Sequence, residues 1–408
     1  MTVDVDGALQ AAFRAEWGRI VAGLIRMTGD WALAEDCAQE AFAAATRRWP
    51  VDGVPASPGG WLTTTARNRA LDRLRRSAVE ARKLEEVLAM QHDPDPAQPI
   101  EDDRLRLIFT CCHPALALEA RVALTLRTLC GLTVAEIGRA FGAGEAAMAK
   151  RLVRARAKID HAGIPYEVPE PEAFPERLPG VLAVLYLLFT EGYAPHEGDR
   201  VVREPLTEEA IRLTRLVAAL LPAEPEVRAL LALELLHDAR RPARTGADGV
   251  PVPLDEQDRG RWDAGRITEG AALLDGLDPA GDGPYALQAR IALEHDRAPA
   301  PALTDRSAIA GLYGRLAVVA PSPFVELARA VAVGLADGPE AGLALLDRLE
   351  SDRRITSGHQ LAAARAELLR RAGRHADART AYEAALARVP NGAERAFLER
   401  RRAEVGER

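Results

Sequence analysis

Long apolar runs are missing from this 408-residue sequence, and cysteines and aromatic residues are few. No uninterrupted apolar stretch approaches the roughly 20 residues that a membrane-spanning helix needs, so no membrane span is expected. The N-terminal sequence MTVDVDGALQ has neither a basic start nor an apolar core, which argues against a secretory signal. These two absences predict a cytoplasmic protein.

The four cysteines are Cys37, Cys111, Cys112 and Cys130, and no two of them form a Cys-x-x-Cys pair. Adjacent side chains point apart, so Cys111, Cys112 and His113 are too cramped to hold one metal ion together. Disulfides are not expected in a reducing cytoplasm. We therefore expect structural thiols, with a zinc or redox site as the alternative, and we predict no metal and no cofactor.

Aromatic residues make up only 5% of the chain, whereas Ala, Leu, Arg and Glu are abundant. This composition favours helices. A length of 408 residues is enough for two or three domains, each with its own core. The composition and length together predict an all-α protein of several helical domains.

Residues 29–76 combine two helices of opposite charge. The first helix is expected to begin at Asp30, which can cap free backbone N–H groups. Its apolar side repeats every four residues, at Leu33, Cys37, Ala41, Ala45 and Trp49. A polar stripe lies beside that side and consists of Glu35, Asp36, Gln39 and Glu40, with Phe42 next to it. Such a stripe is either an ordinary solvated face or a surface that docks on another protein.

Residues 51–60 (VDGVPASPGG) hold three glycines and two prolines, which predicts a loop. Ser57 followed by Pro58 then predicts the start of the second helix. Residues 61–83 contain seven basic and two acidic residues, although the whole chain has a net charge of −7. A positive segment in an acidic protein indicates phosphate binding, and Trp61 beside it suits unpaired bases. The alternative is a solvated basic face.

The motifs AEDCAQEAF at 34–42 and WLTTTARNRALDRLRR at 61–76 resemble the second conserved region of bacterial sigma factors of the extracytoplasmic-function type. In that family the acidic helix docks on the largest polymerase subunit, and the basic helix melts and holds the −10 promoter element. The resemblance implies contacts with core RNA polymerase at Glu35, Asp36, Gln39, Glu40 and Phe42. It implies −10 contacts at Trp61, Arg67, Asn68, Arg69, Arg73, Arg75 and Arg76. The loop 51–60 would lie where the family captures a flipped-out base.

Residues 104–162 are predicted to form a second module, a helix-turn-helix. Its first apolar face, formed by Val122, Leu126 and Leu129, ends at Gly131. Thr133 and Glu136 have the spacing of a capping box, and Ile137 and Phe141 follow as core anchors. Residues 142–144 would form the turn, and 145–159 the second helix, with Met148 and Leu152 pointing inward.

The second helix of this motif is basic, and its positive residues are Lys150, Arg151, Arg154, Arg156 and Lys158. The segment resembles the fourth region of sigma factors, which reads the −35 element, so the resemblance implies −35 contacts at these five positions. It departs from the family at Ala149, where a lysine is common. Between the two modules, residues 92–103 hold five acidic residues, no basic residue and three prolines, which indicates a linker.

The resemblance to the two sigma regions stops near residue 165. Residues 164–180 are expected to be a proline-rich connector, and the apolar run 181–189 to be a buried helix. A polar cluster then includes His237, Asp238, Asp255, Gln257, Asp258 and Asp263. We interpret this cluster as a salt-bridged junction. A regulatory contact with the sigma core and a hydrolase site centred on His237 are the alternatives, although no nucleophile motif accompanies the cluster.

A repeat follows from residue 305. Tyr313 and Tyr382 are 69 residues apart, as are Pro321 and Pro390, which is two periods of about 34 residues. Gly338 and Gly373 would form successive turns between helices. The segment 357–390 resembles a tetratricopeptide repeat, which implies a concave surface for a protein or peptide partner.

We therefore predict five parts: 8–78, sigma region 2; 79–103, an acidic linker; 104–162, sigma region 4; 180–300, a helical extension; and 301–405, tetratricopeptide-like repeats. The protein would bind core RNA polymerase and promoter DNA, would contact no membrane and would catalyse no reaction. This layout resembles sigma factors whose fused extension is thought to tune the sigma core. The alternative is a stand-alone helix-turn-helix regulator with a repeat-protein sensor. Such a regulator would not need the polar stripe, because it does not dock on polymerase.

Overall fold

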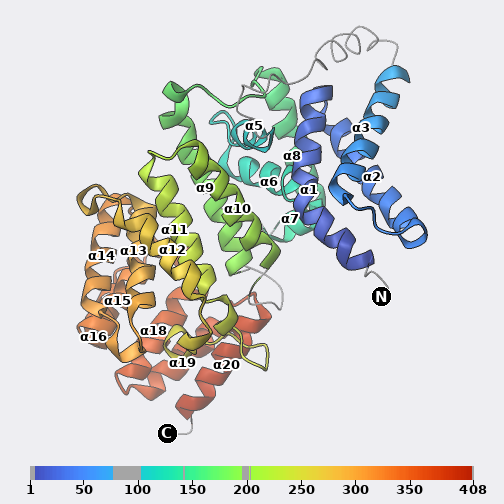
Figure 1. Ribbon diagram of the computed structural model, residues 1–408. Coiled ribbons are helices and arrows are strands. Elements are labelled where there is room, and N and C mark those ends of the chain that lie inside the picture. Colours follow the sequence, from blue (N-terminus) through green and yellow to red (C-terminus); the bar gives the residue numbers. More distant parts are fainter. Residues whose placement is uncertain (1–4, 77–102, 141–142, 195–201, 203, 407–408) are drawn as a thin grey trace. The chain divides into compact units, whose positions relative to one another are not determined.

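The computed structural model describes residues 5–76, 103–140, 143–194, 202 and 204–406 (Figure 1). In these ranges the regular elements are helices, as predicted, and an isolated β-bridge joins Thr245 and Pro251. The chain divides into two compact units, Met1–Leu188 and Phe189–Arg408. Within the described ranges, no helix is long and apolar enough to cross a membrane.

Unit 1 begins with three helices that pack against one another (Figure 1): α1 Val5–Thr28, α2 Trp31–Asp52 and α3 Pro58–Arg76. Asp30 caps α2 as predicted, because its carboxylate accepts hydrogen bonds from the backbone N–H groups of Ala32 (2.8 Å) and Leu33 (3.0 Å). The apolar side of α2 faces the core, and Cys37 and Trp49 are buried there.

The loop between α2 and α3 is shorter than the predicted 51–60. Its predicted start was wrong, whereas the helix start predicted at Pro58 is confirmed. Helix α2 continues through Pro50 to Asp52, where Gly53 (φ 85°) donates its N–H to the carbonyl oxygen of Trp49. Pro50 removes one hydrogen bond from this last turn, and the buried Trp49 anchors the turn by edge-to-face contact with Trp61 (5.8 Å). Helix α3 begins at Pro58 and includes both following glycines. Pro58 suits the first turn because the N–H that it lacks would have no partner within the helix.

The second module of unit 1 contains α5 Asp103–Cys111, α6 Leu118–Thr128, α7 Val134–Ala140 and α8 Glu145–His161. The predicted capping box is confirmed. The backbone N–H of Thr133 donates to the Glu136 carboxylate (2.8 Å), and the N–H of Glu136 donates to the Thr133 hydroxyl (3.2 Å). Ile137, Met148 and Leu152 are buried, as the helix-turn-helix prediction requires.

Two predicted features lie outside the described residues. They are the core anchor Phe141 with the start of the turn at Gly142, and the acidic linker 79–103 except for its last residue. That last residue, Asp103, begins α5 and forms an ion pair with Arg26 of α1 (3.0 Å). The acidic segment therefore ends on a contact between the two modules.

The connector predicted at 164–180 is helical in its second half, which corrects the prediction. A 3-10 turn at Pro171–Ala173 leads into α9, Phe174–Tyr193, and the boundary between the two units falls inside this helix. Phe174 stacks on Phe109 (ring centroids 5.9 Å apart), and Arg177 donates to the carbonyl oxygen of Phe109 (2.8 Å). This packing on α5 stabilises a helical start that the prolines alone argue against.

Unit 2 continues with the helices α10 Glu204–Leu220, α11 Pro225–Ala239, α12 Ala264–Asp275, α13 Pro284–Arg297, α14 Arg306–Val319, α15 Pro323–Ala336, α16 Pro339–Asp347, α17 Arg353–Thr356, α18 Gln360–Arg371, α19 His375–Leu386 and α20 Gly392–Gly406. Most helices pack on the next one along the chain, as in α14 with α15 and α18 with α19. Gly338 (φ 106°) and Gly373 (φ 74°) form turns between helices, as predicted. Ala366, Ala378 and Tyr382 are buried where α18 and α19 cross.

Candidate protein and nucleic-acid interfaces

The polar stripe of α2 is only partly on the surface. Asp36 and Gln39 are exposed, and Glu40 is half-buried. Glu35 and Phe42, which belong to the same predicted docking set, are only 4% and 8% exposed. Phe42 packs on the ring of Phe13 of α1, with centroids 5.1 Å apart. The structure therefore separates the five predicted polymerase contacts into an accessible group and a buried pair.

Glu35 is buried because it binds two arginines of the second module. Its Oε2 lies 3.0 Å from Nε of Arg127 on α6, and its Oε1 pairs with Nη2 of Arg156 on α8. We call these three residues the Glu35 triad. Burial raises the pKa of the Glu35 carboxyl above its ordinary value, although both guanidiniums act to lower it. The triad joins a predicted polymerase contact to a predicted −35 contact.

The two modules also approach each other closely beside the triad. A Cβ atom added to Gly18 of α1 would lie 2.6 Å from the carbonyl oxygen of Leu129, just after α6. A Cβ atom on Gly131 (φ 70°) would lie 2.6 Å from the ring of Phe13. Glycine is thus required on both sides of this contact. Sequence patterns gave no signal for the interface, because they do not pair residues that are distant along the chain.

Helix α3 presents its predicted −10 residues in two groups. Arg67, Asn68, Arg75 and Arg76 are exposed, and Trp61 is partly exposed. Arg69 and Arg73 bind the acidic residues of α2 instead: Arg69 pairs with Glu40 (2.7 Å), and Arg73 pairs with Glu40 and with Asp36 (3.4 Å). Arg69 and Arg73 therefore face α2, where they form ion pairs with carboxylates of the polar stripe.

Helix α8 shows the same division. Lys150, Arg154 and Lys158 are exposed and recur every four residues, so they share one face of the helix. Arg151 pairs with Glu119 (3.0 Å), and Arg156 belongs to the Glu35 triad. Three of the five predicted −35 residues thus form an open cationic face.

The cysteines have the surroundings of structural thiols. Cys37, Cys111 and Cys112 are buried, and Cys130 is half-buried. Burial raises the pKa of the Cys111 thiol to about 12 and also raises the pKa of the Cys112 thiol. A protonated thiol is a poor nucleophile and a poor metal ligand. In the part of the chain that the structure describes, no three His, Cys, Asp or Glu side chains gather closely enough to hold a metal ion.

The polar cluster predicted around His237 does not converge on one site. His237 packs edge-to-face on Tyr193 (5.0 Å), and burial lowers the pKa of its imidazole to about 3. Asp258 and Asp263 cap helices, accepting hydrogen bonds from the N–H groups of Gly260 (2.9 Å) and Arg266 (3.1 Å). These contacts favour the salt-bridged junction over the hydrolase interpretation.

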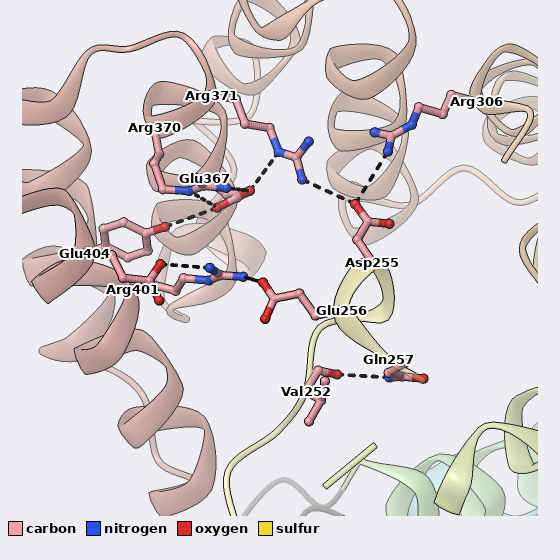
Figure 2. Close-up of polar contacts among 11 residues, drawn as sticks. Val252, Asp255, Glu256, Gln257, Arg306, Glu367, Arg370, Arg371, Arg401 and Glu404 are labelled. Atoms are coloured by element: carbon pink, nitrogen blue, oxygen red, sulfur yellow. Dashed lines mark hydrogen bonds and ion pairs between the residues drawn. The ribbon is translucent and has the colours of Figure 1, made fainter. Parts of the chain in front are cut away.

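Ion pairs hold this junction together. Asp238 pairs with Arg266 of α12, and Arg240 pairs with Asp296 of α13 (2.6 Å). The 3-10 turn Leu254–Glu256 extends the junction to later helices (Figure 2). There Asp255 lies 3.6 Å from Arg306 and 3.4 Å from Arg371, and Glu256 pairs with Arg401.

Three segments of the chain match known families. Residues 13–79 match Sigma-70 region 2, residues 106–159 match Sigma-70 region 4, and residues 177–277 match a family of unknown function, DUF6596. An uncharacterized protein of Rhizobium meliloti (strain 1021) is 41% identical over 92% of this chain and 90% of its own length. No solved structure matches the chain.

Two named relatives match a shorter part. The probable ECF RNA polymerase sigma factor SigI of Mycobacterium tuberculosis is 31% identical over 38% of this chain and 56% of its own length. The probable RNA polymerase sigma factor RfaY of Xanthomonas campestris pv. campestris is 33% identical over 36% of this chain and 40% of its own length.

A helical module with a basic helix, followed by a helix-turn-helix, defines a DNA-binding protein of transcription initiation. The chain belongs to the sigma-70 family, as an extracytoplasmic-function sigma factor whose two sigma regions precede a helical C-terminal extension.

Proposed function

We propose that this sigma factor binds core RNA polymerase and directs it to promoters by holding the −10 element on α3 and reading the −35 element on α8. The observation that carries this proposal is that two modules matching sigma regions 2 and 4 each present an open cationic face. Cationic side chains release counterions when they bind phosphates, which supplies much of the affinity for DNA. In the division proposed from the sequence, residues 8–78 and 104–162 carry these two roles.

The docking surface on polymerase would begin with Asp36 and Gln39, which are exposed. Glu35 joins the set only after the second module leaves α2, because the Glu35 triad buries it. Phe42 is covered by Phe13 of α1, which belongs to its own module. We therefore propose that polymerase binding separates the two modules and exchanges Arg127 and Arg156 for partners on the polymerase.

The DNA contacts of α3 would also form in two steps, because two of its arginines are already paired within the protein. Arg67, Asn68, Arg75 and Arg76 of α3 are available at once, whereas Arg69 and Arg73 must first leave Glu40. The Glu40 pairs are about two-fifths exposed, and exposed pairs are worth roughly 0–1 kcal/mol. A phosphate can therefore replace Glu40 at little cost.

The extension is proposed to regulate this core, in a cytoplasmic protein with no catalytic step. It is more than half of the chain, and its helical hairpins include a groove of about 820 Å³ along α16, α18 and α19. Such a groove suits the protein or peptide partner that tetratricopeptide-like repeats bind.

In vitro transcription tests the proposal, with purified protein, bacterial core polymerase and the promoter of the protein's own gene. We expect a discrete start that requires this protein. Asp36→Lys should reduce the transcript and co-elution with polymerase on gel filtration. Asp6→Lys, the same charge reversal at an exposed position of α1, is the matched control. A protein that binds promoter duplex but forms no complex with polymerase would instead be a stand-alone regulator.

The same assay tests the role of the extension. A chain that ends after Ala194 keeps the whole of α9, whose first half packs on α5, and is therefore a better truncation than one at residue 165. Equal transcription by the full and truncated chains would argue against regulation by the extension.

A further inference from the structure

A cavity of about 310 Å³ lies in unit 2 between α13, α14, α15 and the turn that carries Asp255. Its wall is largely apolar and includes Ile309, Leu327, Val331 and Leu335. Phe324 also lines it while remaining 52% exposed, so the apolar wall reaches the surface. The volume is at the lower end of the roughly 300–1,000 Å³ of small-molecule sites.

One end of the cavity is polar and carries an arginine with spare donors. Arg306 lies 3.6 Å from Asp255, which is within ion-pair range but beyond a hydrogen bond. Asp255 lies between Arg306 and Arg371, as Figure 2 shows, so one carboxylate serves two guanidiniums. Arg371 has a second partner, Glu367, at 2.8 Å. Among the described residues the guanidinium of Arg306 has no hydrogen bond to another side chain or to the backbone, and its donors stay available.

Two further donors stand at the same end. The Thr304 hydroxyl accepts a hydrogen bond from Arg259 (3.4 Å), so its own proton is left to donate. His295 also lines the cavity, and its Nδ1 is buried with no hydrogen-bond partner in the described part of the chain. Burial lowers the pKa of this imidazole to about 4, so the ring is neutral near pH 7 and donates from one nitrogen. Arg306 and Thr304 therefore add donors at this end against the acceptor Asp255, and the neutral ring of His295 contributes one donor and one acceptor.

We propose that this cavity binds a small organic carboxylate with an apolar body. The carboxylate would pair with Arg306 and accept from the Thr304 hydroxyl, and the body would lie along Ile309, Leu327 and Val331. Asp255 would keep Arg371 as its partner, so its carboxylate would remain paired. A cationic ligand would meet the guanidinium of Arg306, and a neutral apolar ligand would leave the donors unpaired.

The larger groove of unit 2 makes a useful comparison. Two of its three arginines are paired with carboxylates: Arg365 binds Asp347 and Glu350 at 2.8 Å each, and Arg374 binds Asp377 at 2.8 Å. The third, Arg388, donates to the carbonyl oxygen of Ala384 (3.0 Å). The smaller cavity differs because its cation has only a distant partner. The proposal gives the extension a ligand, which goes beyond the promoter function and does not depend on it.

Isothermal titration calorimetry of the full chain with sodium decanoate tests the proposal, and decan-1-ol serves as the uncharged probe. We expect one saturable decanoate site per chain and an affinity for decanol that is lower by about tenfold or more, since a charge-assisted hydrogen bond is lost. Because no polymerase is present, failure here would leave the promoter function untouched.

Two variants and a matched control locate the site. Arg306→Gln should lower the decanoate affinity by about tenfold or more and leave decanol binding unchanged. Arg329→Gln is the control, because Arg329 has a similar exposure and pairs with Glu326 on α15 without lining the cavity. Ala328→Phe fills the cavity and should abolish binding of both probes, with thermal unfolding used to confirm that the variant folds.

Two outcomes would overturn the proposal. One is the absence of saturable decanoate binding to the wild-type chain. The other is decanoate binding that Arg306→Gln leaves unchanged, because a carboxylate in this cavity must use that guanidinium.

Discussion

Two ion pairs, one in each unit of this protein, have different roles. In unit 2, Arg240 and Asp296 join α11 to α13, and their side chains are only 5% and 0% exposed. In unit 1, the Arg69–Glu40 pair has side chains that are 37% and 38% exposed, and both residues belong to predicted binding sets. The Arg240–Asp296 pair is therefore part of a fixed core, whereas the Arg69–Glu40 pair can be exchanged for outside partners.

The Glu35 triad stands between these two cases. Its carboxylate is as buried as a core pair, with 5% of the side chain exposed, yet all three residues lie at the boundary of two modules. Breaking a buried pair inside a core costs several kcal/mol, whereas separating whole modules can return the charged groups to water. The triad therefore holds the modules together more firmly than a surface pair and less permanently than the core of unit 2.

The largest loss of stability is expected from Asp296→Ala in unit 2. The change leaves Arg240 buried without its carboxylate, which should cost about 3–5 kcal/mol of local stability. Hydrogen exchange of the amides in α11 and α13 measures this cost. Glu269→Ala is the control, since Glu269 pairs with Arg215 in the open and exposed pairs contribute about 0–1 kcal/mol. Equal effects of the two variants would remove the distinction between core and surface pairs.

A smaller effect is expected from Glu35→Gln in unit 1. The change leaves Arg127 and Arg156 without a carboxylate and should weaken the contact between modules by about 2 kcal/mol, the scale of a charged hydrogen bond. Faster hydrogen exchange in α6 and α8 would report it. Gly18→Ala should act in the same direction by a different route, because its Cβ would collide with the backbone of Leu129.

Asp36→Asn is the matched control for this test. It removes one carboxylate from the next position of α2, where the side chain is 60% exposed and lies 3.4 Å from Arg73. If Asp36→Asn and Glu35→Gln changed the exchange of α8 equally, the triad would not be what holds the modules together.

The sequence predicted local structure correctly where a feature depends on residues that are close together along the chain. The cap at Asp30, the start of α3 at Pro58 and the capping box of Thr133 and Glu136 each depend on near neighbours, and each is confirmed. Its errors came from packing: the prolines of 174–180 favour a connector, but Phe174 stacks on Phe109 and the segment is helical.

The partners of the predicted site residues could not be found in the same way. Helical periodicity places Glu35 on a polar stripe, which the sequence interprets as an exposed surface. Its partners Arg127 and Arg156 lie 92 and 121 residues away along the chain. Arg306 and Asp255 also lie far apart along the chain, so the polar end of the cavity has no local sequence pattern. Local patterns identify which residues are charged, and only the tertiary fold decides which charges remain free.

The smallest effect concerns the binding of −35 duplex. Arg154 is exposed on α8, so Arg154→Ala should remove about one phosphate contact, weaken binding by up to about tenfold and lower the salt slope by about 1. Arg156→Ala should leave that slope unchanged and instead loosen the modules, because Arg156 binds Glu35. Fluorescence anisotropy of a labelled −35 duplex across a salt series measures both slopes. If the two variants lowered the salt slope equally, Arg156 would leave Glu35 to bind DNA. The ion pairs of the triad would then be exchangeable, like those of Glu40.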